Sequence, residues 1–143
     1  MQNVSFEEVV ERIVEADPRY HADAYDFLRE ALDYTQQHIV NDLPSEVPRH
    51  VTGQQLLQGI RDLALRQFGP MTMTVLDAWG IRRCEDFGDI VFNLVEHRFL
   101  RKRDEDRRED FQGGYDFEEV FVLPFLPSSR RQTRQNQPAP RVE

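Results

Sequence analysis

The sequence predicts a mostly α-helical protein, with about five helices around one core and a small C-terminal β-hairpin. In five stretches, apolar residues recur with the three- and four-residue spacing of a helix face, and proline, glycine or capping residues separate these stretches. After Gly113 and Gly114, aromatic residues alternate as in a strand. The chain has 143 residues and is 39% hydrophobic, so one helical domain over residues 1–123 is expected, with a disordered basic tail over 124–143.

The first two helices are separated by a proline. Residues 6–16 place apolar side chains on one face and glutamates on the other, which is typical of a short amphipathic helix. Asp17 suits a cap and Pro18 suits the first turn of a second helix, because the residue before a proline is pushed out of the helical region. The second helix is therefore expected from Pro18 to about Val40.

The third and fourth helices are marked by their ends. Thr52 and Gln55 have the spacing of a capping box at the start of the third helix, and Gly69 followed by Pro70 ends it. The fourth helix opens near Pro70 and stops at Gly80. Its apolar face is expected to consist of Val75, Leu76 and Trp79.

The fifth helix and the hairpin complete the predicted fold. The helix is expected over residues 86–98, with five apolar side chains facing the core: Phe87, Ile90, Val91, Leu94 and Val95. A strand at about 99–103 is expected to pair with a strand at about 115–122, because Tyr115, Phe117 and Phe121 share strand parity. Residues 101–110 carry five basic and five acidic side chains, which is typical of a solvated surface.

The segment from Gln67 to Arg103 also has the order of elements found in winged-helix DNA readers. It contains two short helices, a tight turn and a basic strand, so the second half of the chain is winged-helix-like and its fifth helix would be the recognition helix. A candidate basic patch flanks this helix and consists of Arg82, Arg83, Arg101, Lys102 and Arg103.

The charge of that helix opposes DNA reading. Its expected outward face carries Asp86, Asp89, Asn93 and Glu96, whereas base edges are read mainly by Arg, Lys, Asn and Gln. Residues 1–123 hold 25 acidic and 14 basic side chains, a net charge of −11, while the tail carries +3. Nucleic acid is therefore not expected to bind the body, and at most weakly the tail.

A second candidate site lies at the start of the second helix. The stretch "DPRYHADAYDF" brings together a candidate interaction patch of Arg19, Tyr20, Asp23 and Tyr25. Two interpretations remain open. The tyrosines pack by their rings and keep their hydroxyl groups in water, as at a capped helix start, or the patch contacts a partner protein.

Motifs for catalysis, metals and membranes are missing from the sequence. The four histidines form no metal-ligand spacing, the single cysteine forms no CxxC pair, and no phosphate loop or nucleophile elbow occurs. No apolar run approaches the roughly 18–20 residues that span a bilayer. We therefore expect a cytoplasmic protein with no cofactor, no metal and no membrane contact.

Four stretches together resemble a family of conserved hypothetical proteins from planctomycete and verrucomicrobial bacteria. They are "DPRYHADAYDFLREAL", "VTGQQLLQGIRDLALRQFGPMTMTVLDAWGI", "EDFGDIVFNLVE" and "DEDRREDFQGGYDFEEVF". The resemblance covers most of residues 6–121 and implies a soluble, intracellular protein, without catalytic or binding residues to carry over. Separately, "LVEHRFLRKRDEDRRED" is similar to the end of the recognition helix and the wing of MarR-type regulators.

From the sequence, the first hypothesis is a non-enzymatic protein–protein interaction or adaptor module with an unknown protein partner. The acidic surface, the aromatic content and the missing catalytic motifs favour this class. A winged-helix-like transcriptional regulator is the alternative, and a small enzyme of unknown chemistry is a distant third.

Overall fold

The structure is a computed structural model that describes residues 5–40, 51–101 and 106–127. These residues are mostly helical and include no strand. The five α-helices are α1 (Phe6–Ala16), α2 (Ala22–Thr35), α3 (Gly53–Phe68), α4 (Thr72–Ala78) and α5 (Cys84–Glu96). Within the described ranges, no helix is long and apolar enough to cross a membrane.

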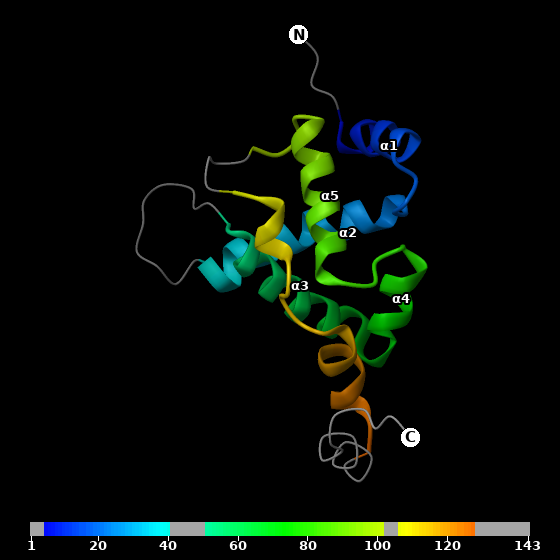
Figure 1. The fold of residues 1–143 in the computed structure, drawn as a ribbon, viewed down its shortest axis with the longest axis vertical. Helices are drawn as coiled ribbons and strands as arrows, with labels where there is room; N and C mark the ends of the chain where they lie inside the picture. The colour runs from blue at the N-terminus through cyan, green and yellow to red at the C-terminus, as the bar shows by residue number, and fades with distance from the viewer. Residues whose placement is uncertain (1–4, 41–50, 102–105, 128–143) are drawn as a thin grey trace, which may run out of the picture.

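Short helical turns connect and extend these helices. They are η1 (Gln36–Val40), η2 (Gly69–Met71), η3 (Arg108–Phe111), η4 (Glu118–Val122) and η5 (Leu123–Phe125). Figure 1 shows α5 crossing in front of α2, with α3 below it and α4 to one side. The turns η4 and η5 lie at the lower end of the molecule in that view.

The core forms where α2, α3 and α5 meet. Leu28 of α2, Ile60 of α3 and Leu94 of α5 are all fully buried there. The α5 residues Phe87 and Ile90 are also buried, as their spacing predicts. Trp79, at the end of α4, is only partly buried, and its ring centroid lies 5.7 Å from those of both Phe27 and Phe68.

Helix ends follow the sequence signals at α3 and depart from them at α2. Thr52 and Gln55 form the predicted capping box, with hydrogen bonds of 3.1 and 3.0 Å. The second helix begins at Ala22, later than the predicted start at Pro18. The reason is that Asp17 accepts the backbone N–H of Arg19, while His21 Nδ1 caps α2 by accepting the N–H of Asp23 at 3.0 Å.

The C-terminal part of the described chain is helical where a strand was expected at about 115–122. The turn η4 buries Val120 and Phe121, and Phe117 just before it is buried too. Phe117 and Phe121 are four residues apart, a spacing that fits a helix face as well as a strand face, and Val120 fits only the helix. Of the other predicted strand, at about 99–103, residues 99–101 form no strand, and 102–103 lie outside the described residues.

Helical structure continues past Leu123, where the domain was expected to end. Pro124 and Phe125 belong to η5, so the folded body extends past Leu123. Residues 128–143 lie outside the described residues.

Helices α2 and α3 pack closely at Gly59. A Cβ atom placed on Gly59 would overlap the hydroxyl oxygen of Thr35 and lie 2.9 Å from its Cβ atom. Thr35 is fully buried, and its hydroxyl group donates to the carbonyl of Ala31 at 2.6 Å. A side chain at Gly59 is therefore excluded by a neighbour that has no free space to move into.

We expect Gly59→Ala to lower the free energy of unfolding by about 1–3 kcal/mol, because it forces α2 and α3 apart. The measurement is urea denaturation. In a Thr35→Ala background the same substitution should cost less, since the overlapping hydroxyl oxygen is gone. Equal costs in both backgrounds would show that Thr35 does not set the helix spacing.

Candidate functional site

The junction between α1 and α2 packs against the polar face of α5. Arg19 links the two: its Nη2 atom lies 2.7 Å from Asp17 Oδ2, and its Nη1 atom lies 3.2 Å from Asp89 Oδ2. The hydrogen bond from Arg19 holds the pKa of Asp17 well below its ordinary value. Asp17 thus stays ionised beside a guanidinium group that also contacts Asp89.

Tyr20 is the centre of this junction. Its side chain is 3% exposed, and its hydroxyl oxygen lies 2.8 Å from both Asp86 Oδ1 and Asp89 Oδ2. A hydroxyl group has one proton to donate, so the two carboxylates compete for it. Burial first, and the two carboxylates second, raise the pKa of Tyr20, which keeps the phenol protonated.

Asn93 continues the network from the next turns of α5. Its Nδ2 atom donates to Asp17 Oδ2 and to the hydroxyl oxygen of Tyr25, each at 3.0 Å. An amide nitrogen has two protons, so both bonds can exist at once. Asn93 is 7% exposed and Tyr25 is fully buried. This face of α5 was expected to face solvent. Asp86, Asp89 and Asn93 instead contact the α1–α2 junction, and only Glu96 is exposed, 3.5 Å from Arg108.

The second carboxylate oxygens of Asp86 and Asp89 also have partners. Asp86 Oδ2 accepts the backbone N–H groups of Arg82 and Arg83 at 2.8 and 3.2 Å, which caps the helix. Asp89 Oδ1 accepts from Arg108 Nη1 at 3.0 Å, and the Arg108 guanidinium group also stacks on Phe92. The network is therefore compensated internally, and its evident role is to fix α5 against the first two helices.

The predicted interaction patch is divided by this packing. Arg19 and Asp23 are exposed, whereas Tyr20 and Tyr25 are buried inside the fold. A partner in contact with this surface would meet only the two charged residues. The two tyrosines follow the structural interpretation of their sequence pattern by packing their rings, and their hydroxyl groups bond to α5 rather than to water.

The predicted basic patch is not gathered in one place. Arg82 and Arg83 precede α5 and Arg101 follows it, so the length of a 13-residue helix, roughly 20 Å, separates them. Arg82 is also paired with Asp77 at 2.8 Å. Lys102 and Arg103 lie outside the described residues.

A cleft of about 410 Å³ opens on the other side of α5. Its walls come from α2 with η1, the start of α3, α5 and the segment around η3. Most of its floor is apolar and only partly buried, and consists of Leu32, Val51, Val91, Phe92, Val95, Phe99 and Leu100. Val91 and Val95 were expected to face the core, and the structure places them at the edge of the core, in the cleft.

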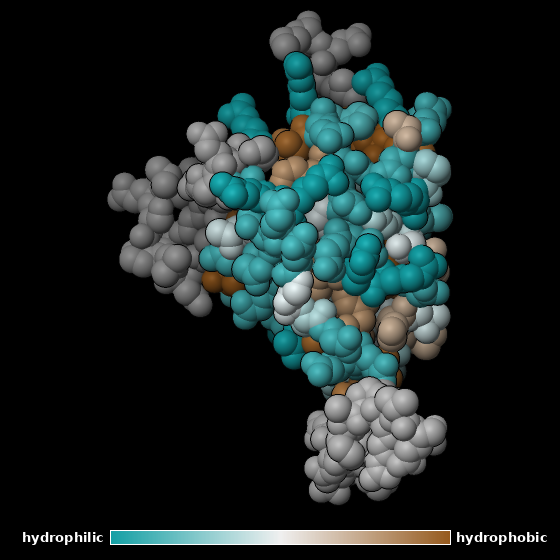
Figure 2. Space-filling view, viewed as in Figure 1, coloured by the Kyte–Doolittle hydropathy of each residue, from teal (hydrophilic) through white to brown (hydrophobic). Residues whose placement is uncertain are grey.

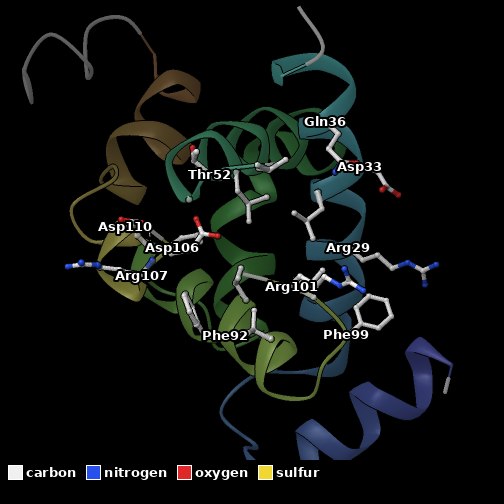
Figure 3. A pocket seen from close by; sticks show the side chains of 18 residues that line it. Arg29, Asp33, Gln36, Thr52, Phe92, Phe99, Arg101, Asp106, Arg107 and Asp110 are labelled. Carbon is white, nitrogen blue, oxygen red and sulfur yellow. Dashed lines mark hydrogen bonds between the residues drawn. The ribbon is translucent and has the colours of Figure 1, made fainter. Parts of the chain in front are cut away.

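Charged side chains lie on two sides of the cleft. Figure 3 shows one group on the side of α2 and the residues after α5, and another around η3. The first group contains Arg29, Asp33 and Arg101, and the second contains Asp106, Arg107 and Asp110. The sequence did not predict this cleft, because its lining comes from four separate segments. The available signal was the pair of aromatic residues Phe92 and Phe99, which lie outside the predicted core face of the fifth helix.

Metal ligands and the single thiol were two further features to locate in the structure. Within residues 5–40, 51–101 and 106–127, no group of three or more His, Cys, Asp and Glu side chains is placed to hold a metal ion. Cys84 is 1% exposed, and burial raises its pKa to about 11. A buried, protonated thiol is a poor nucleophile.

No protein-family model, curated protein or solved structure matches the chain. The resemblance to planctomycete and verrucomicrobial proteins therefore stays an expectation from the sequence.

We expect Asp17→Asn to destabilise the protein by about 1–2 kcal/mol near neutral pH, because the hydrogen bonds from Arg19 lose their charged acceptor. Folding lowers the pKa of Asp17, so its contribution is present above the ordinary carboxyl pKa of 3.8 and is lost as the pH falls below that value. Urea denaturation of both proteins at several pH values measures the difference.

The exposed Glu15→Gln substitution is the matched control, since it also removes one negative charge from this part of the chain. It should leave stability nearly unchanged. A difference between wild type and Asp17→Asn that stays constant down to strongly acidic pH would contradict the assigned role of the Asp17 carboxylate.

Proposed function

We propose that the protein is a non-enzymatic protein–protein interaction or adaptor module, and that its partner binds in the cleft beside α5. The observation that carries the proposal is the cleft itself, which combines a partly exposed apolar floor with a charged rim. Protein interfaces have this composition, with aromatic and aliphatic side chains at the centre and polar groups around them. A volume of about 410 Å³ suits a few anchoring side chains.

The polar network supports the same proposal indirectly. The carboxylates of Asp17, Asp86 and Asp89 accept hydrogen bonds from within the protein, so they serve packing. The cleft, by contrast, offers apolar surface that no described residue covers. The face of the molecule that Figure 2 shows, viewed as in Figure 1, is mainly hydrophilic, with smaller hydrophobic groups between the hydrophilic ones.

DNA binding ranks second as a proposed function. A recognition helix must present its polar face to the major groove. The polar face of α5 is in contact with Arg19, Tyr20 and Tyr25, and its carboxylates would oppose phosphates. The winged-helix comparison thus rests on the order of elements alone.

If the partner binds in the cleft, a substitution in the cleft floor should reduce the binding of that partner. We expect Leu100→Glu, in the cleft floor, to reduce capture of the partner from the native cell at least tenfold, because a carboxylate would be buried against apolar surface. The measurement is an affinity pull-down with nuclease treatment, quantified by mass spectrometry. Circular dichroism must show that the variant stays folded.

Met73→Glu is the matched control, because Met73 is an apolar residue of α4 that is 37% exposed and does not line the cleft. Partners should be retained by this variant. If Met73→Glu alone lost the partner, the interface would lie at α4 rather than in the cleft. If nuclease treatment removed every captured partner, the DNA-binding alternative would be favoured.

The charge distribution predicts weak DNA binding at most. In fluorescence anisotropy with random duplex DNA at physiological salt, we expect the chain with Arg130, Arg131 and Arg134 replaced by Gln to show no binding at micromolar protein concentration. The unmodified chain should bind weakly, with a shallow salt dependence because few phosphates are neutralised. Tight binding that survives the three substitutions would overturn this ranking.

A further inference from the structure

We infer that the cleft recognises a peptide segment in which apolar anchors are accompanied by a single carboxylate, which is bound by Arg29 and Arg101. This inference rests on the proposed function and specifies the chemistry of the partner. Arg29 belongs to α2, and Arg101 follows α5, yet both line the same cleft. Figure 3 shows them on the same side of the cleft, together with Phe99.

These two arginines have no carboxylate partner in the part of the chain that the structure describes. Both side chains are exposed. The Arg29 guanidinium carbon lies 4.8 Å from the centroid of the Phe6 ring, a stacked position that orients the group and leaves its N–H donors at the edge unused. Planar guanidinium groups bind carboxylates through paired hydrogen bonds, so two of them at one apolar cleft favour such a ligand.

On the η3 side of the cleft, Asp110 already has hydrogen-bond partners within the protein. The Asp110 carboxylate accepts the backbone N–H of Arg107 at 3.1 Å and the carbonyl of Asp110 accepts from Gln54 at 2.6 Å, so Asp110 is engaged in holding η3. Arg107 stands beside it on the same side. The three charged residues of the η3 side, Asp106, Arg107 and Asp110, carry a net charge of −1, so the arginine side is the one that favours a carboxylate.

The number of carboxylates follows from the surrounding charge. Asp33 lies one helical turn after Arg29, so the arginine side carries only one net positive charge. Residues 1–123 have a net charge of −11, and the Debye length at physiological salt is about 8 Å. A run of acidic residues would extend beyond the arginines into repulsive surroundings, whereas one carboxylate would be seated between them.

The test uses the full chain and a displayed library of random peptides of about twelve residues. We expect the selected peptides to share apolar residues and one Asp or Glu. A synthetic selected peptide should bind about tenfold more weakly when its acidic residue is replaced by the corresponding amide. Arg29→Gln or Arg101→Gln should weaken the acidic peptide by a similar factor and leave the binding of the amide peptide unchanged.

Arg66→Gln is the matched control. Arg66 is also exposed and stacks on an aromatic ring, that of Tyr34, but it does not line the cleft. It should change the affinity less than twofold. An equal effect of all three substitutions would show that net charge, rather than two placed arginines, controls binding, and would overturn the inference.

Failure of the inference can be told apart from failure of the proposed function. Selected peptides that lose binding with Leu100→Glu but show no preference for a carboxylate would overturn the inference and leave the proposed function standing. Peptides that ignore Leu100→Glu, or a library that yields no binder, would overturn the cleft as the interface. If another part of this chain already filled the cleft, the library would yield no binder.

Discussion

The hydroxyl group of Tyr20, 2.8 Å from the carboxylates of both Asp86 and Asp89, fixes where α5 sits on the first two helices. An apolar contact alone would allow the helix to rotate or slide, because hydrophobic burial has no preferred direction. Hydrogen bonds to charged groups are directional and costly to leave unmade. The junction therefore specifies one orientation of α5, and buried polar contacts of this kind contribute more to that choice than to net stability.

The orientation of α5 in turn creates the cleft. Its three sides have different tasks: Asp86, Asp89 and Asn93 meet the α1–α2 junction, Phe87, Ile90 and Leu94 enter the core, and Val91, Phe92 and Val95 line the cleft. Successive residues of a helix are about 100° apart, so rotation of α5 by one residue would turn the valines into the core and close the cleft wall. Junction and cleft are thus two consequences of a single helix placement.

The sequence was informative about the helices and much less so about their polar faces. The apolar spacing of α1 and α5 and the capping box of α3 depend on neighbours in the chain, so they could be read directly. The outer face of α5 could not, because Asp86 and Asp89 follow the same pattern whether they face water or the protein's own Tyr20 and Arg19. Asn93, an amide among apolar neighbours, was the one local sign that this face is covered. The strand predicted at about 115–122 was wrong for a related reason. The spacing of Phe117 and Phe121 fits both a strand and a helix, and only packing in the folded protein decides between the two.

The charges of the protein act in opposite directions over different distances. The acidic body produces a negative field that attracts basic partners from afar and weakens with salt. For a carboxylate bound in the cleft as proposed, Arg29 and Arg101 would act at contact distance, where the field of the body matters less. For a partner that binds as proposed, the two ranges select different features: an overall basic or neutral surface for fast encounter, and one carboxylate beside apolar anchors for retention. Added salt would then slow association more than it accelerates dissociation, because the long-range attraction is screened first while the contacts in the cleft persist.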